Sequence, residues 1–120
     1  MKKSIIFPGQ GSQYAGMGKY LYDNFDYVKK LHDEVNSALD LNLTDIIFDK
    51  NNKEAINLTQ NTQPAIMVTS YAIFTVLKKE KGIDISNFNF CAGHSLGEYT
   101  ALLISNSLKF NNLEEFYFQI

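Results

Sequence analysis

The chain opens with a short apolar segment and continues with apolar residues at helical spacing. Residues 4–7 read Ser-Ile-Ile-Phe and stop at Pro8 and Gly9, which is typical of a strand that ends in a turn. Beyond this turn, apolar side chains recur every three or four residues, as on one face of a helix. They are Met17, Tyr20, Leu21, Phe25, Val28, Leu31, Val35 and Leu39. The spacing predicts helix over 17–39, broken in two near Asp23 and Asn24.

The middle of the chain predicts a short helix, a loop and a long buried helix. Residues 43–47 give the short helix, and the polar residues 49–54 give a surface loop. Apolar side chains then cover nearly every side of residues 64–79, as in a helix enclosed in a core. We expect Thr62 to cap this helix, Pro64 to lie in its first turn, and Gly82 to end it.

A second apolar strand leads into a motif that carries chemistry. Residues 88–92 read Phe-Asn-Phe-Cys-Ala, residues 93–97 read Gly-His-Ser-Leu-Gly, and a small-residue helix is expected from 98 to about 105. This is the G-x-S-x-G pattern between a strand and a helix, in which a sharp turn exposes the serine. It predicts a nucleophile elbow with Ser95 at its apex. The alternative is an ordinary strand-to-helix turn without a catalytic role.

The order of these elements predicts an α/β fold with a parallel sheet and flanking helices, in the manner of α/β-hydrolases. Only two strands are predicted, however, and a stable sheet usually needs three or more. The long apolar helix also has too little sheet to cover it, and residues 113–120 stop in mid-pattern without a cap or a glycine. We therefore expect residues 1–120 to be the front part of one larger domain.

Composition narrows the class of protein. At 120 residues, with 45% hydrophobic residues and a net charge of −2, the chain is at most one weakly acidic, soluble domain. The 11 basic residues are matched by 13 acidic ones and form no long block, so we expect no nucleic-acid partner. The apolar run after Lys2 and Lys3 is too short for a signal peptide, and none is long enough to cross a membrane. A cytoplasmic protein is expected.

A serine acyl-transfer site needs a nucleophile, a base and donors for the oxyanion. Ser95 supplies the nucleophile, and the backbone N–H of Leu96, the next residue, is the expected first donor. The glycine-bearing turn after the first strand allows a close backbone approach, and the N–H of Gln10 in that turn is our candidate for the second donor.

The base is missing from this pattern. His94 adjoins Ser95, and the sharp turn is expected to point its ring away from Oγ and toward neighbouring backbone groups, which it would hydrogen-bond. His32 is expected to be a solvated helix residue. The single Cys91 rules out an internal disulfide and is expected to be a buried packing residue of its strand. Two isolated histidines and one cysteine show no ligand spacing, so we expect neither a metal nor a cofactor.

Three motifs together resemble one family. Residues 7–13 (Phe-Pro-Gly-Gln-Gly-Ser-Gln), 62–65 (Thr-Gln-Pro-Ala) and 93–99 (Gly-His-Ser-Leu-Gly-Glu-Tyr) are similar, in order and spacing, to those of bacterial malonyl-CoA:acyl-carrier-protein transacylases. The resemblance covers essentially the whole chain. It implies a ping-pong reaction for fatty-acid synthesis, in which a serine takes malonyl from coenzyme A and the phosphopantetheine thiol of acyl carrier protein collects it.

The resemblance also implies residue roles. Ser95 would be the acylated nucleophile, and the amides of Gln10 and Leu96 would form the oxyanion hole. Gln63 would lie near the active-site entrance. His94 would line the substrate pocket without acting as the base.

The chain lacks several residues and a subdomain that the family has. The family's arginine that binds the malonyl carboxylate falls at Ile120, and isoleucine offers no donor. The family's catalytic histidine, the residue that supports it, and a small ferredoxin-like subdomain lie beyond residue 120. We therefore interpret the chain as an N-terminal piece of an S-malonyltransferase, inactive and poorly soluble alone.

Other interpretations stay open. The main one is a non-catalytic half that pairs with a separately encoded C-terminal piece through an exposed apolar face. A small esterase that borrows an external base, or an acyltransferase of different acyl selectivity, also fits the motifs.

Overall fold

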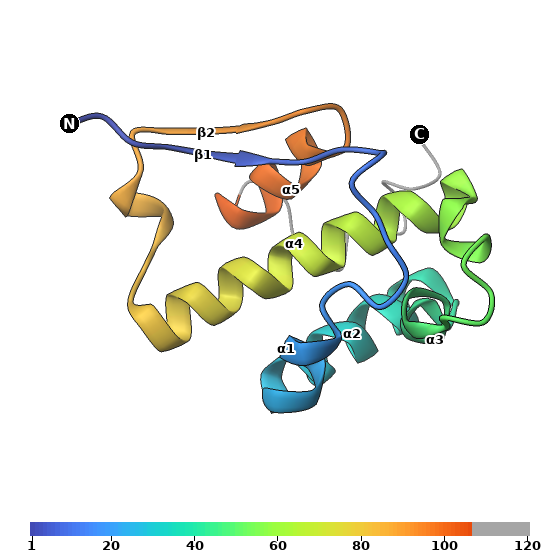
Figure 1. Ribbon diagram of the computed structural model, residues 1–120. Coiled ribbons are helices and arrows are strands. Elements are labelled where there is room, and N and C mark those ends of the chain that lie inside the picture. Colours follow the sequence, from blue (N-terminus) through green and yellow to red (C-terminus); the bar gives the residue numbers. More distant parts are fainter. Residues whose placement is uncertain (107–120) are drawn as a thin grey trace.

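The computed structural model describes residues 1–106, in which a pair of strands lies over a layer of helices (Figure 1). In chain order the elements are β1 (Ser4–Phe7), α1 (Lys19–Asn24), α2 (Asp26–Leu39), α3 (Leu43–Phe48), the short 3-10 helix η1 (Ala55–Asn57), α4 (Thr59–Lys81), the 3-10 helix η2 (Ile85–Asn87), β2 (Phe90–Gly93) and α5 (Gly97–Ile104). The predicted segment 113–120 lies outside the described residues.

The two strands pair in parallel, which confirms the predicted sheet type, and Phe7 lies opposite Gly93. Successive strand residues face opposite sides of a sheet. Phe7 is accordingly buried against the helices, whereas Ile6 and Phe90, on the other face, are 71% and 56% exposed. β2 starts two residues later than predicted, because the amide of Phe88 closes the η2 turn instead of joining the sheet.

The predicted break in the first helical stretch is confirmed. α1 ends at Asn24, Phe25 has an extended backbone (φ −131°, ψ 115°), and α2 begins at Asp26. The short helix α3 and the surface loop after it also lie where the polar and apolar pattern put them.

The long helix α4 begins earlier than predicted. Its first residue is Thr59, so Thr62 is not the N-cap and Pro64 is not in the first turn. The cause lies in the preceding η1 turn: the Thr62 hydroxyl donates to the carbonyls of Ile56 and Leu58. Because a side chain satisfies these carbonyls, the turn continues directly into helix three residues ahead of the predicted cap.

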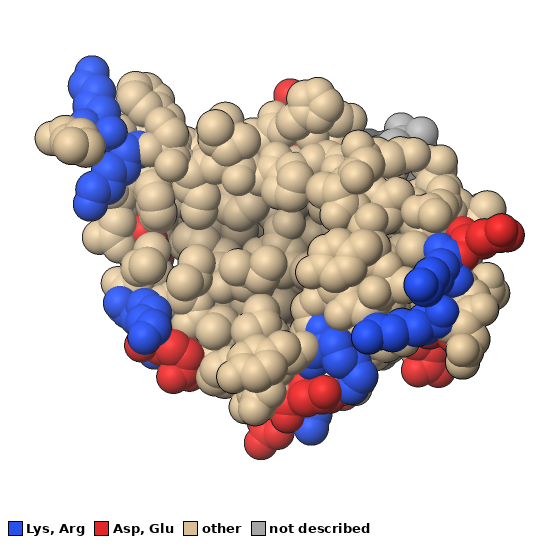
Figure 2. Space-filling view, in the orientation of Figure 1, with Lys and Arg blue, Asp and Glu red and all other residues tan. Residues whose placement is uncertain are grey.

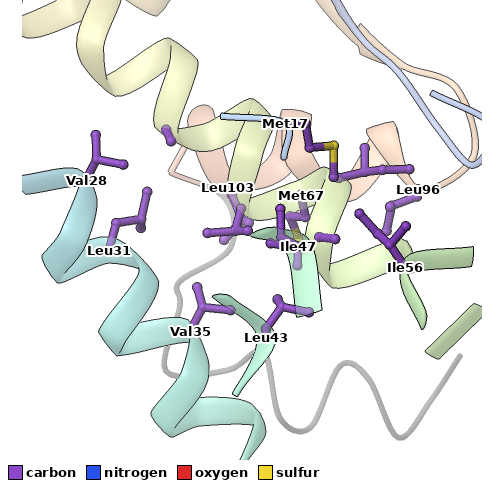
Figure 3. Close-up of a cluster of buried hydrophobic side chains, with 14 residues drawn as sticks. Met17, Val28, Leu31, Val35, Leu43, Ile47, Ile56, Met67, Leu96 and Leu103 are labelled. Atoms are coloured by element: carbon purple, nitrogen blue, oxygen red, sulfur yellow. The ribbon is translucent and has the colours of Figure 1, made fainter. Parts of the chain in front are cut away.

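α4 is enclosed along most of its length, as its apolar pattern predicted. α5 lies between α4 and the two strands (Figure 1), and it contacts both. The largest group of buried side chains, which we call the central cluster, includes Met17, Ile56, Met67 and Leu96 (Figure 3). Gly82 ends α4 as predicted, with a left-handed backbone (φ 66°).

Charged side chains lie around the rim of the face seen in Figure 2, and the middle of that face, over α4 and the loop from β1 to α1, carries none. Basic and acidic groups are interspersed along its lower edge. In the described part of the chain, no helix is long and apolar enough to cross a lipid bilayer.

Candidate active site

Ser95 occupies the tight turn that joins β2 to α5. Its backbone is left-handed (φ 54°), a conformation that costs a non-glycine residue roughly 1 kcal/mol. The residue is exposed and lies just before α5, and its carbonyl accepts the amide of Glu98 at 3.0 Å, which ties the turn to the start of the helix. A serine held out of the ordinary backbone regions at an exposed turn is often functional.

The two glycines of the motif make this turn sterically possible. A methyl group built on Gly93 would lie 1.8 Å from the carbonyl carbon of Gly97, and one built on Gly97 would lie 2.1 Å from the carbonyl oxygen of Phe7. Real contacts of this kind are never so short. The strand, the helix and β1 therefore meet at a distance that only glycine permits.

The loop after β1 lies directly against the Ser95 turn. The amide of His94 donates to the carbonyl of Phe7 at 3.1 Å. A methyl group built on Gly9 would lie only 2.5 Å from the His94 carbonyl oxygen. The structure thus brings residues 9–10 and 94–96, which are far apart in the sequence, to the same end of the parallel strands.

The two amides proposed as oxyanion donors lie on the two sides of this contact. Gln10 is exposed in the loop, whereas the Leu96 side chain is buried in the central cluster and its backbone precedes α5. Within residues 1–106, neither the Gln10 N–H nor the Leu96 N–H donates to another protein group. No group in this part of the chain therefore competes with a ligand for these two donors.

Gln63 is a half-buried residue in the second turn of α4. Met67 follows one helical turn later on the same face and packs in the central cluster together with Leu96. The Gln63 side chain makes no hydrogen bond to the rest of the described chain.

His94 behaves differently from the prediction in one respect. Its ring lies next to Gly9, where a methyl group would be 3.3 Å from Nδ1, but it makes no hydrogen bond within residues 1–106. The turn is held instead by the backbone of His94, whose amide donates to Phe7 and whose carbonyl accepts the amide of Gly97 at 2.9 Å.

The prediction of a solvated His32 is wrong. The side chain is 3% exposed, and its Nδ1 lies 3.1 Å from the Thr44 hydroxyl. Tyr22 meets the ring edge-on and Phe48 stacks on it. Burial lowers the pKa of His32 from 6.5 to about 4, against the opposing effect of Asp33. The sequence pattern hid this role because the ring's partners come from α1 and α3.

Cys91 is half-buried rather than fully buried, and it packs beside a small cluster that includes Phe7 and Phe74. Its Sγ is 3.9 Å from the Ala101 carbonyl oxygen. Burial raises the pKa of the thiol, which disfavours the thiolate that a nucleophile would need. In the described chain, no three His, Cys, Asp or Glu side chains are grouped so that they could hold a metal ion.

Sequence reasoning missed one part of the site, the side chain of Gln13. Its Oε1 accepts the amide of Gly11 at 2.8 Å, and its Nε2 donates to Asn57 Oδ1 at 3.0 Å. The only sequence signal for this contact is the second glutamine of the Gly-Gln-Gly-Ser-Gln motif.

Comparisons with known proteins identify relatives of this chain. The chain is 44% identical to malonyl CoA-acyl carrier protein transacylase of Bacillus subtilis over 111 residues, which are 92% of this chain and 33% of that protein. Its fold matches the crystal structure of acyl-carrier-protein-S-malonyltransferase from Bartonella henselae (TM-score 0.88, 38% identity), covering 98% of this chain and 37% of that one.

A further solved structure contains a type II polyketide acyl-carrier protein in complex with its malonyl-transacylase. This chain matches the transacylase with a TM-score of 0.84 and 34% identity, over 98% of this chain and 37% of that one. The chain thus spans about a third of the length of the relatives it matches. The model of the acyl transferase domain family matches residues 5–114, and the chain belongs to that family.

Proposed function

We propose that this chain carries the acylation site of a malonyl transfer from coenzyme A to acyl carrier protein, with Ser95 as the nucleophile of an elbow. The observation that carries the proposal is the exposed, left-handed Ser95 between β2 and α5, next to the Gly9–Gln10 loop. The identity to malonyl transacylases supports the choice of acyl group. Residues 1–120 are, on this proposal, the N-terminal part of one acyltransferase domain.

The chemistry follows from the groups around the turn. Ser95 Oγ attacks the thioester carbonyl of malonyl-CoA, and the carbonyl oxygen becomes an oxyanion that accepts the N–H groups of Gln10 and Leu96. Collapse breaks the carbon–sulfur bond, so coenzyme A leaves as the thiol with the proton that Ser95 gave up. The thiol of acyl carrier protein then attacks the serine ester and releases Ser95 again.

The N-terminus of α5 assists the same step. The Leu96 amide precedes the first helical residue, Gly97, and free amides at this end of a helix attract negative charge. Removing one oxyanion donor typically costs about a hundredfold or more in rate. An amide held in place by the buried Leu96 side chain is a donor that needs no reorganisation during the reaction.

Gln63 and His94 are proposed to contact the substrate. Gln63 lies one helical turn from the central cluster that also holds Leu96, and its side chain is uncommitted within residues 1–106. The exposed ring of His94 lies beside Gly9 at the mouth of the same turn. Neither is assigned the role of base.

We further propose that these 120 residues are inactive on their own in malonyl transfer to acyl carrier protein. His32 is committed to Thr44 and to two aromatic rings, so it is not available to take the Ser95 proton. Ile120, where the family has its carboxylate-binding arginine, lies outside the described residues and has no donor in any case. Loss of one member of a catalytic unit costs several powers of ten in rate.

The test is to incubate the chain with malonyl-CoA and weigh it by intact-protein mass spectrometry. We expect a slow malonyl adduct that is absent from Ser95→Ala, with Ser105→Ala, a serine at the other end of α5, as the matched control. An adduct that persists in Ser95→Ala would refute the assignment of the nucleophile. Multiple-turnover transfer to acyl carrier protein would refute the proposed inactivity.

A second candidate is a non-catalytic half that pairs with a separate C-terminal piece. The observation that favours it is the outer face of the two strands, where Ile6 and Phe90 are 71% and 56% exposed. Beside it, a groove of about 440 Å³ runs along β2 and α5 and is lined largely by small and apolar residues, among them Ala92 and Leu102. Exposed apolar surface of this kind usually marks an interface.

This candidate is tested by mixing the chain with a polypeptide that corresponds to the remaining two thirds of the Bacillus relative. A 1:1 complex in light scattering, weakened by Phe90→Asp and unaffected by the exposed Tyr20→Asp, supports pairing through this face. No complex at high concentration would refute it.

A further inference from the structure

The loop between β1 and α1 has no regular secondary structure of its own around Gln10, yet its peptide units are held by specific hydrogen bonds. The Ser12 hydroxyl donates to the Gly9 carbonyl at 2.9 Å, and the Ser12 amide reaches the same oxygen at 3.4 Å. The next peptide is held by Gln13, whose Oε1 accepts the Gly11 N–H at 2.8 Å.

These bonds control the direction of the Gln10 amide through peptide geometry. The carbonyl of Gly9 and the N–H of Gln10 belong to one planar, trans peptide unit, so they point in opposite directions. Fixing the Gly9 oxygen on the Ser12 side therefore turns the Gln10 N–H to the other side. The following peptide would otherwise be free to rotate, because Gly11 has φ 111° and open space around its α-carbon.

The loop is also anchored to the helical layer, through the side chain of Gln13. Gln13 Nε2 donates to Asn57 Oδ1 at 3.0 Å, and Asn57 ends the η1 turn. Its neighbour Ile56 is 1% exposed and packs in the central cluster with Leu96 (Figure 3). The loop that carries one proposed oxyanion donor is thus tied to the same packed side chains that fix the other.

We propose that Ser12 and Gln13 are positioning residues for the oxyanion hole, with Asn57 as the anchor of Gln13. They act through Gln10, whose N–H they orient, and they do not touch the substrate. This inference rests on the proposed acyl-transfer function for its purpose, although the orientation itself is a property of the free chain.

The test measures the loop directly by nuclear magnetic resonance of the full chain. The wild type is expected to show a scalar coupling across the hydrogen bond from the Gly11 nitrogen to the Gln13 side-chain carbonyl. Ser12→Ala and Gln13→Ala are each expected to shift the Gln10 amide signal. Gln13→Ala is also expected to speed the hydrogen exchange of the Gly11 amide about tenfold, because this amide loses its acceptor. Ser12→Thr keeps the donor to the Gly9 carbonyl, and Gln13→Glu keeps the acceptor for the Gly11 amide. Because the Asn57 amide can turn its Nδ2 toward the new carboxylate, both variants are expected to restore the wild-type orientation of Gln10.

Two variants that each add one negative charge test whether Asn57 anchors Gln13. Gln13→Glu and Asn57→Asp each leave one donor between the two side chains, whereas the combined variant sets two carboxylates opposite each other. Only the combined variant is expected to release the loop. Unchanged Gln10 signals in Ser12→Ala and Gln13→Ala would overturn the proposal, as would failure of the conservative variants to restore them.

An acylation assay separates this proposal from the proposed function. Where wild-type Ser95 is acylated by malonyl-CoA, Ser12→Ala should lower the acylation rate about tenfold at saturating malonyl-CoA without weakening its binding. An equal rate in Ser12→Ala would count against positioning. If the wild type gives no adduct at all, the proposed acylation by this chain fails, and the resonance experiment still decides the orientation of Gln10.

Discussion

In the described chain, the polar groups of the Ser95 turn are exposed and partly unpaired, whereas those around His32 are buried and paired with each other. Around Ser95 the polar groups are exposed, and within residues 1–106 two backbone amides have no protein acceptor. Around His32 the side chain is buried, and Thr44 and Asn36 hydrogen-bond in a chain beside it. A histidine occurs in each region, yet among residues 1–106 only the buried one is held by side-chain hydrogen bonding.

The difference distinguishes a candidate ligand-binding site from a contact that only holds two helices together. The left-handed backbone of Ser95 costs stability, and amides beside it without an acceptor in the described chain are suited to binding an oxyanion. Polar groups that satisfy each other inside the protein fix the relative positions of α2 and α3 and leave nothing for a ligand. The following predictions change one of the two regions and compare it with the other or with a matched residue elsewhere in the chain.

The largest effect is expected from Gly97→Ala. Its methyl group would lie 2.1 Å from the Phe7 carbonyl oxygen, and backbone atoms on both sides of the contact cannot easily move. We expect a loss of about 3 kcal/mol in the free energy of unfolding, measured by urea denaturation. Gly82→Ala is the control: it has φ 66° but open space around it, so strain alone should cost roughly 1 kcal/mol. Equal losses would show that the close approach is not limiting.

The His32 region should dominate the acid response. The pKa of His32 is about 4 in the folded chain and 6.5 when solvated, so the unfolded state binds the extra proton first. Stability should therefore be complete above pH 6.5 and fall by about 3 kcal/mol as the pH drops to 4. His32→Gln removes this titration, and its unfolding free energy should be flatter over that window. The same slope in both proteins would assign the acid response to carboxylates.

The sequence was informative where neighbours in the chain decide the outcome, and less so where distant segments do. The break at Phe25 and the end of α4 at Gly82 follow from local backbone preferences, and both were predicted. The start of α4 was not, because Thr62 bonds back to the η1 turn. His32 was misjudged because its enclosing rings come from α1 and α3.

In the candidate site, too, the sequence predicted the local feature and missed the long-range contact. The G-x-S-x-G spacing located Ser95 at a turn between strand and helix, where the structure has it. The bond from Gln13 to Asn57 spans 44 residues and has no local signature, so only the fold reveals it.

Two buried threonines allow a matched test of side-chain pairing. Thr44 lies in the His32 region and bonds both His32 Nδ1 and Asn36 Nδ2. Thr44→Val leaves those nitrogens without their acceptor or donor, which should cost about 2 kcal/mol. Thr100 on α5 is fully buried, but its hydroxyl has no partner among the described residues. Thr100→Val should therefore be neutral or slightly stabilising in the same denaturation experiment, and an equal loss would contradict this view of Thr44.

The smallest effect is expected from His94→Ala, although this residue adjoins the proposed nucleophile. Its ring is exposed and makes no hydrogen bond within residues 1–106, so the free energy of unfolding should change by less than about 0.5 kcal/mol. His32→Ala, which empties a ring-sized space between Tyr22 and Phe48, is the comparison and should cost several times more. If His94→Ala instead destabilised the chain as much as His32→Ala, the ring would be part of the packing that holds the turn. Because the backbone bonds of residue 94 to Phe7 and Gly97 survive the substitution, the Ser95 turn should keep its geometry. Any loss of the proposed Ser95 acylation would then report on contact with the substrate.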